Sequence, residues 1–192
     1  KNVTLLLKEC RAPQSPSPDI WLALAPIKNK TEAVGDKATE LGVRAITLVF
    51  TQHAVVRSIK HEKLSAHVIE AAEQCERHDV PEIREAKDLP TLLGNWPKDR
   101  VLLYGDESGN GTPLKQLLSA LPQGKYGILI GPEGGFSADE HRILQSASFI
   151  KPFGLGPRIL RADTAAIAAL ACVQSWLGDW HLAPRFESKA AS

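Results

Sequence analysis

The sequence has few cysteines and no long apolar run. The three cysteines, Cys10, Cys75 and Cys172, are far apart and form no C-x-x-C or Cys/His spacing, which argues against a zinc site and against a disulfide-bonded secreted domain. No apolar run reaches the roughly 18 residues that a membrane span needs. No basic segment followed by an apolar core marks a secretory signal. We therefore expect a soluble, cytoplasmic protein that binds neither a metal ion nor a membrane.

The chain also lacks an excess of either charge. Its 192 residues carry a formal net charge of +1, and 23% of them are charged. This composition excludes a disordered chain and argues against a strongly basic nucleic-acid binder. If the substrate is RNA, the attraction must come from local basic patches, from a dimer or from a further part of the protein. The length fits one domain of ordinary size with a substantial core.

From residue 19 onward, apolar runs of strand length alternate with segments of helical character. The expected strands are Ile20–Ala25, Ala45–Phe50, Val101–Tyr104, Gly127–Ile130 and Phe149–Phe153. The expected helices are Thr31–Leu41, Leu64–Arg77, Leu114–Leu121, Ala138–Ala147 and Thr164–Leu177. Continuous apolar runs are typical of parallel strands that are buried on both faces. The pattern predicts an α/β fold with a parallel sheet flanked by helices. Periodicity alone favours an open doubly wound sheet, because knotted chains are rare.

The segment ILIGPEGGFSADE, residues 128–140, joins an apolar strand to a helix through a glycine-rich turn. Ser137 and Glu140 have the S-x-x-E spacing of a helix capping box. Gly134 and Gly135 carry no Cβ and can adopt positive φ, so a purine or ribose could lie flat against the main chain. The turn is neither a G-x-G-x-x-G motif nor a P-loop. Taken alone, it is equally typical of a tight connection without a ligand.

A second glycine turn follows in the segment LGPRILRADTA, residues 155–165. It carries two arginines, Arg158 and Arg161, close to Gly156. Two successive strands therefore each end in a glycine turn.

Together, the two turns resemble the signature of the RsmE family of SPOUT methyltransferases. The resemblance extends from about Asp19 to His181 and includes the segments KATELGV, residues 37–43, and EAAEQCER, residues 70–77. Members of this family transfer a methyl group from S-adenosylmethionine to N3 of a uridine in 16S ribosomal RNA within the small ribosomal subunit. The resemblance implies a SPOUT-type α/β domain with a deep C-terminal trefoil knot. It also implies a homodimer, formed in part by the alanine-rich last helix.

The resemblance further implies a division of the chain into three parts. Residues 1–18 would be the remnant of an N-terminal PUA-like β-barrel domain plus a linker, and the absence of methionine from the chain agrees with a missing part. Within this remnant, Val3–Leu7 could form a strand, and Pro13, Pro16 and Pro18 would stiffen the linker. Residues 19–181 would form the SPOUT methyltransferase domain, and residues 182–192 a flexible tail.

In the family, three loops bind a bent cofactor, mostly through backbone groups. Here these loops would be Tyr104–Glu107, Gly131–Gly135 and Leu155–Leu160. The residues expected to bind S-adenosylmethionine here are Tyr104, Gly105, Gly131, Pro132, Glu133, Gly134, Gly135, Leu155, Gly156, Ile159 and Leu160. The alternative for the glycines is turn geometry without a ligand, and for the leucines and the isoleucine it is ordinary core packing.

Arg158 and Arg161 are the expected catalytic residues. Methylation of uridine N3 requires loss of the imide proton, and a guanidinium group near O2 or O4 would stabilise the resulting anion. The alternative is an ion pair with Asp163 at the surface. No general base stands out among the six histidines.

Three residues are expected to contact RNA. Arg57 belongs to a local basic cluster, and the resemblance places the segment of Gln74 and Arg77 near the active site. Two other functions stay open: a SPOUT enzyme acting on tRNA or on a ribose 2′-hydroxyl, and a non-catalytic α/β module that binds a nucleotide or RNA.

Overall fold

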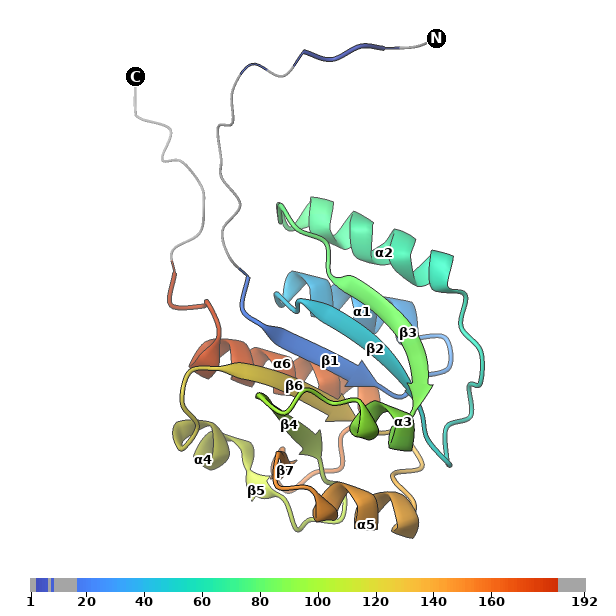
Figure 1. The fold of residues 1–192 in the computed structure, drawn as a ribbon, viewed down its shortest axis with the longest axis vertical. Coiled ribbons are helices and arrows are strands. Elements are labelled where there is room, and N and C mark those ends of the chain that lie inside the picture. Colours follow the sequence, from blue (N-terminus) through green and yellow to red (C-terminus); the bar gives the residue numbers. More distant parts are fainter. Residues whose placement is uncertain (1–2, 7, 9–16, 183–192) are drawn as a thin grey trace.

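The computed structural model describes residues 3–6, 8 and 17–182 of the chain. Seven strands form one sheet in the order β3-β2-β1-β6-β4-β7-β5, and all six pairings are parallel (Figure 1). The strands are β1 (Ile20–Leu24), β2 (Ala45–Phe50), β3 (Glu82–Asp88), β4 (Arg100–Gly105), β5 (Thr112–Pro113), β6 (Lys125–Ile130) and β7 (Ile150–Gly154). The expected α/β class with a parallel sheet flanked by helices is confirmed.

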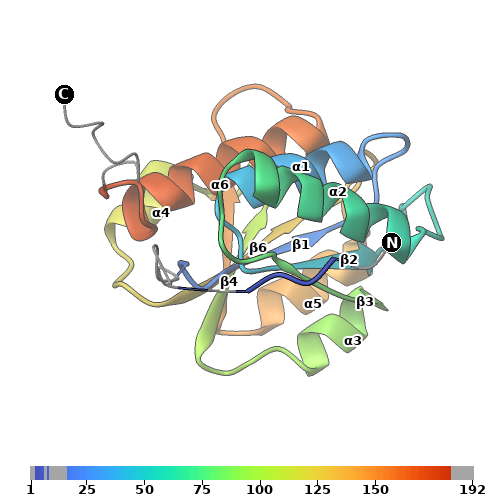
Figure 2. The ribbon, with the colours of Figure 1, turned by 90° about the horizontal axis from the view of Figure 1, so that it is seen from above.

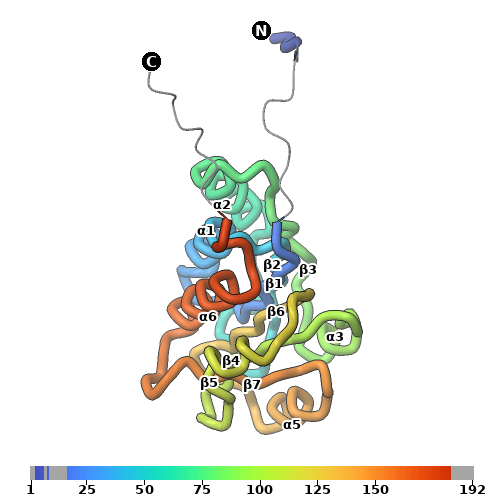
Figure 3. The backbone as a smooth tube through the Cα atoms, turned by 90° about the vertical axis from the view of Figure 1, so that its left-hand side faces the viewer, coloured from blue at the N-terminus to red at the C-terminus, as the bar shows by residue number. Residues whose placement is uncertain are grey.

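Helices cover both faces of the sheet, as Figures 2 and 3 show from two further directions. The helices are α1 (Thr31–Glu40), α2 (His61–Gln74), α3 (Leu89–Gly94), α4 (Leu114–Ser119), α5 (Ala138–Ser146) and α6 (Ala162–Leu177). Apolar side chains of α1, α2, α4 and α6 form one core cluster with the sheet, and those of α3 and α5 form a second. None of the described helices is long and apolar enough to cross a membrane.

Strand β1 shows why the apolar runs are continuous. Ile20, Leu22 and Leu24 pack in the first core cluster, whereas Ala23, which points to the opposite face, packs in the second. Four of the five β1 residues are buried and the fifth is half-buried. A strand between two helical layers has no face that is exposed to water, so its sequence does not alternate between polar and apolar residues.

Three elements were missed by the sequence analysis because their signals are weak. Strand β3 has the sequence EIREAKD, lies at the edge of the sheet and contains no buried residue. An edge strand that faces water needs no apolar run. Helix α3 spans only six residues, and its start is marked by Asp88, whose side chain accepts a hydrogen bond from the backbone N–H of Thr91. The two-residue strand β5 is too short to produce a pattern.

Some expected boundaries differ from those of the structure. Helix α2 begins at His61 rather than Leu64 and ends at Gln74 rather than Arg77, and α6 begins at Ala162 rather than Thr164. The expected strand Val3–Leu7 is not formed at residues 3–6, which have no hydrogen-bonded partner strand, and Leu7 lies outside the described residues. Of the other expected terminal features, Pro13, Pro16 and residues 183–192 also lie outside them.

Candidate functional site

A cavity of about 730 Å³ lies where β4, β6 and β7 end. Its walls come from the three loops that follow these strands, and from Ala162 and Ala165 at the start of α6. Ten of the eleven residues expected to bind the cofactor line it: Gly105, Gly131, Pro132, Glu133, Gly134, Gly135, Leu155, Gly156, Ile159 and Leu160. The tertiary structure therefore brings together residues that the sequence separates by up to 55 positions.

Tyr104 is the one expected cofactor residue that does not line the cavity. Its side chain is buried on the opposite face of the sheet, where its ring lies 6.1 Å from that of Phe136 in an edge-on arrangement. Burial raises the pKa of the Tyr104 phenol, and the carboxylate of Asp106 raises it further. Successive strand residues point to opposite faces, so Tyr104 stays a predicted cofactor residue through its backbone groups only.

Positive φ angles occur in both glycine turns. Gly135 has φ of 69° and Gly156 has φ of 94°, a region that disfavours any residue with a Cβ. At Gly135 the space is also occupied, because a Cβ there would lie 2.4 Å from Glu107 Oε1. At Gly156 a Cβ would meet nothing within 4 Å. The first turn therefore needs glycine for conformation and for packing, the second for conformation alone.

Side-chain contacts hold the first glycine turn in place on both sides. The expected capping box is present: the Ser137 hydroxyl accepts from the N–H of Glu140, and the Glu140 carboxylate accepts from the N–H of Ser137. The other oxygen of Glu140 accepts from the N–H of Gln52 at 2.8 Å, and His53 Nδ1 lies 3.0 Å from the carbonyl oxygen of Gly134. The loop after β2 thus supports the turn after β6.

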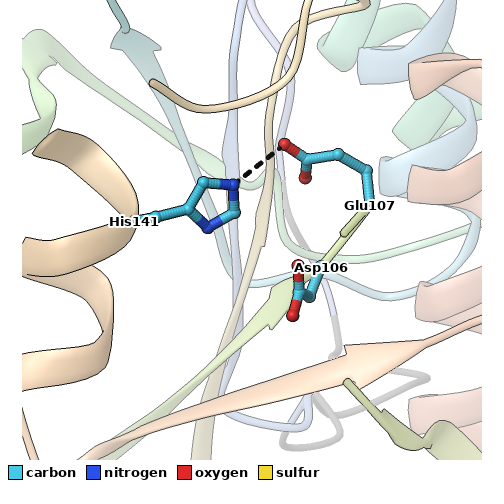
Figure 4. Close-up of side chains that lie close together, drawn as sticks. All are labelled: Asp106, Glu107 and His141. Atoms are coloured by element: carbon cyan, nitrogen blue, oxygen red, sulfur yellow. Dashed lines mark ion pairs between the residues drawn. The ribbon is translucent and has the colours of Figure 1, made fainter. Parts of the chain in front are cut away.

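Three side chains to which the sequence analysis gave no individual role lie close together: Asp106, Glu107 and His141 (Figure 4). Asp106 and Glu107 belong to the expected cofactor loop Tyr104–Glu107 and line the cavity. Asp106 accepts hydrogen bonds from the backbone N–H and the hydroxyl of Ser108, which shapes the loop after β4. Glu107 Oε1 accepts from the N–H of Phe136 at 2.7 Å and lies 3.3 Å from His141 Nε2. The available signal was the D-E-S-G segment directly after a strand, because Asp followed by Ser and Gly is typical of a side-chain-supported turn.

The two expected catalytic arginines have different surroundings. Arg158 lines the cavity, is exposed, and forms no hydrogen bond or ion pair with any described residue. Arg161 is exposed at the N-cap of α6 and does not line the cavity. Asp163, the alternative partner for either arginine, instead forms an ion pair with Lys30, which lowers the pKa of Asp163. The guanidinium group of Arg158 is therefore available to a ligand.

The expected RNA contacts are spread over the molecule. Arg57 is exposed on the loop after β2, on the same edge of the sheet as the cavity, and donates to the carbonyl of Gln52. Arg77 lies at the opposite edge, where its guanidinium donates to the carbonyls of Thr39 and Val43 and pairs with Asp79.

Gln74 is exposed at the C-terminus of α2, next to the same far edge as Arg77. Within one chain, Gln74 and Arg77 are therefore not near the cavity. The reason is that α2 runs antiparallel to the strands, which carries its C-terminus away from their carboxyl ends. The Arg77 side chain is only 11% exposed, and its hydrogen bond to Thr39 connects the segment after α2 with the C-terminal end of α1.

Comparisons with known proteins identify the family. Residues 13–174 match the profile of a family described as an RNA methyltransferase domain. The ribosomal RNA small subunit methyltransferase E of Rickettsia conorii is 35% identical over 175 residues, which cover 90% of this chain and 71% of that protein. The chain belongs to the ribosomal RNA small subunit methyltransferase E family. The resemblance inferred from the two glycine turns is thereby confirmed.

Two solved structures are similar over most of the chain. The family member from Neisseria gonorrhoeae, bound to S-adenosyl methionine, matches with a TM-score of 0.78 and 28% identity over 90% of this chain and 71% of that one. A methyltransferase from Legionella pneumophila in complex with its cofactor SAM matches with a TM-score of 0.77 and 32% identity, over 85% of this chain and 68% of that one.

Proposed function

We propose that this chain is an S-adenosylmethionine-dependent methyltransferase that modifies N3 of a uridine in the 16S RNA of the small ribosomal subunit, and that it acts in the cytoplasm. The observation that carries the proposal is the cavity at the ends of β4, β6 and β7, with the unpaired Arg158 at its wall. Family membership and the two cofactor-bound relatives support the choice of cofactor.

The residues of the cavity fit a nucleoside-containing cofactor. Its volume of about 730 Å³ lies within the usual range for small-molecule sites. Leu155, Ile159 and Leu160 offer apolar contacts for a purine, and the glycine turn leaves main-chain groups open to a ligand. Ile159 is 95% exposed, so a bound ligand would cover an apolar side chain that water now surrounds. When bound, S-adenosylmethionine supplies an electrophilic methyl group on a positively charged sulfur.

Arg158 would then act on the RNA base. Removal of the N3 proton leaves negative charge on the uracil O2 and O4 atoms, and a guanidinium group that lines the cavity can donate hydrogen bonds to these atoms. Arg161, at the start of α6, is close enough along the chain to contact the adjoining phosphate or base. Alignment of N3 with the methyl group supplies a further part of the rate enhancement.

The proposal includes the trefoil knot and the homodimer of the SPOUT fold. The two glycine turns would be the crossings of the knot, where two stretches of main chain approach closely. A symmetric dimer would use α6, where Ala165, Ala168 and Ala171 are only partly buried and keep the helix surface small, whereas Ala166 and Ala169 are buried in the core of the same chain. In such a dimer, Gln74 remains a predicted RNA contact, although it lies far from the cavity of its own chain.

The decisive experiment replaces Arg158 by alanine. The rate of methyl transfer to small ribosomal subunits should fall by about 10²-fold, the usual effect of removing one donor that stabilises an anion. The affinity for S-adenosylhomocysteine, measured by calorimetric titration, should change little. Arg142→Ala is the matched control, because Arg142 is equally exposed but pairs with Asp139 on α5, outside the cavity.

Three results would contradict the proposal. Methylation at the parent rate in the Arg158 variant would remove Arg158 from the mechanism. A product methylated on a ribose oxygen would favour the alternative SPOUT activity. Binding of ATP without binding of S-adenosylhomocysteine would favour the non-catalytic nucleotide-binding module.

A further inference from the structure

Glu107 lines the cavity but has no part in the mechanism above. It lies in the loop after β4, residues 106–111, and its side chain is 39% exposed. Through Oε1 it reaches across to the glycine turn, where it accepts the N–H of Phe136, and to α5, where it lies 3.3 Å from His141 Nε2 (Figure 4). Glu107 is thus held by two elements other than its own.

These contacts use one carboxylate oxygen only. Within the described residues, Oε2 of Glu107 accepts no hydrogen bond, whereas Asp106 next to it is buried and already accepts two bonds from Ser108. A carboxylate that is fixed through one oxygen presents the other in a defined direction without further loss of side-chain entropy. By contrast, Glu133, the other exposed carboxylate of the cavity, has no contact within the described residues that would hold it in place.

We propose that Glu107 accepts hydrogen bonds from the ribose hydroxyls of the bound cofactor, an inference that rests on the proposed function. The ribose of S-adenosylmethionine carries two neighbouring hydroxyl donors, and a carboxylate is the group that dinucleotide-binding folds use for such a pair. The position is suitable, because Glu107 lines the cavity and its Oε1 lies against Gly135, in the glycine turn that lines the same cavity. His141 keeps the carboxylate from turning away from the cavity.

Two other roles for Glu107 give different results in experiments. As an electrostatic partner of the sulfonium, it would favour S-adenosylmethionine over S-adenosylhomocysteine. Asp106, Glu107 and His141 also place one potential ligand atom each within 4.8 Å of one another, which is compatible with a divalent cation. Contacts within the protein already account for these positions: Asp106 accepts two hydrogen bonds from Ser108, Glu107 accepts one from the Phe136 N–H, and His141 lies 3.3 Å from Glu107 and packs against aromatic rings. We therefore favour the ribose.

The test measures affinities by calorimetric titration for S-adenosylhomocysteine and for its 2′-deoxy and 3′-deoxy analogues. In the parent protein, at least one deoxy analogue should bind about tenfold more weakly, since a hydrogen bond to a charged acceptor is lost. In Glu107→Ala, affinity for S-adenosylhomocysteine should fall about tenfold, and the further loss for the deoxy analogue should be less than about twofold.

Glu107→Gln keeps an acceptor for the Phe136 N–H and so protects the fold of the turn. We call the loss of affinity on going from S-adenosylhomocysteine to its deoxy analogue the deoxy penalty. For Glu107→Gln this penalty should lie between those of the parent and of the alanine variant, and the thermal midpoint of unfolding should be unchanged. Asp139→Asn is the control for the loss of one negative charge nearby, because Asp139 lies on α5 outside the cavity. Asp139→Asn should show the same loss of affinity for the deoxy analogue as the parent.

An equal deoxy penalty in the parent and in both Glu107 variants would overturn the inference and leave Glu107 as a support for the turn. A loss of affinity in Glu107→Ala that is larger for S-adenosylmethionine than for S-adenosylhomocysteine would assign it to the sulfonium instead. Affinity that rises with Mn²⁺ only when Glu107 is present would assign it to a metal ion. If the parent fails to bind S-adenosylhomocysteine at all, the proposed function fails first.

Discussion

Replacing Gly135 by alanine tests the contact between the first glycine turn and Glu107. Two costs add. Alanine at φ of 69° is disfavoured by about 1–2 kcal/mol relative to its usual backbone conformations. The new Cβ would lie 2.4 Å from Glu107 Oε1, so the carboxylate must move and its hydrogen bond to the Phe136 N–H is lost. That bond contributes about 0.5–1.5 kcal/mol.

The expected total loss in the free energy of unfolding is about 1.5–3.5 kcal/mol. For a domain of this size, each kcal/mol lowers the thermal midpoint by about 2–4 °C, so Gly135→Ala should unfold about 3–14 °C below the parent. Gly156→Ala is the matched control. Its φ of 94° imposes the same kind of backbone cost, but its Cβ would meet nothing within 4 Å. It should cost about 1–2 kcal/mol only.

A double-mutant cycle, measured by urea unfolding, separates the backbone cost of alanine at Gly135 from the cost of displacing the Glu107 carboxylate. In the Glu107→Ala background no carboxylate occupies the space beside Gly135, so Gly135→Ala should cost about 1 kcal/mol less there than in the parent. The reasoning would be refuted if Gly135→Ala and Gly156→Ala cost the same, or if the cycle gave no coupling between Gly135 and Glu107.

Three further predictions address binding, assembly and pH. Gly134→Val should abolish binding of S-adenosylhomocysteine in calorimetry, because Gly134 lines the cavity. The variant should stay folded by circular dichroism, because the φ of Gly134 is not positive and the atoms nearest to the new Cβ belong to the exposed His53. Unchanged affinity would show that the turn is only structural. Light scattering should report about twice the chain mass of 20.9 kDa, and a monomer at every concentration would remove the shared-interface proposal. The ion pair with Lys30 lowers the pKa of Asp163 from its ordinary value of 3.8, so its contribution to stability is present above that value and is lost as pH falls through the lower, folded-state pKa. Below about pH 4, Asp163→Asn should therefore lose less stability than the parent, by under about 1 kcal/mol because the pair is still partly exposed to solvent. Parallel pH curves of urea unfolding for the two proteins would contradict this.

The sequence alone was enough to predict the α/β class, the central strands and the two glycine turns. The reason is local: apolar runs without alternation require burial on both faces, and Ser137 with Glu140 sets the start of α5 through contacts that span three residues. The eleven expected cofactor residues came from the family resemblance, and ten of them line one cavity because parallel strands end at one edge of a sheet and the loops after them meet there.

Only the tertiary structure decided which side chains face that edge together. Tyr104 directly precedes Gly105 in the chain, but its side chain faces the opposite helical layer. The guanidinium group of Arg77 donates hydrogen bonds to backbone carbonyls at the far end of the sheet. Glu107 and His141 lie 34 residues apart and come together because β4 and β6 are neighbours in the sheet, which places the loop after β4 against α5. Strand pairing of this kind depends on contacts between distant parts of the chain, and no pattern within a single segment encodes it.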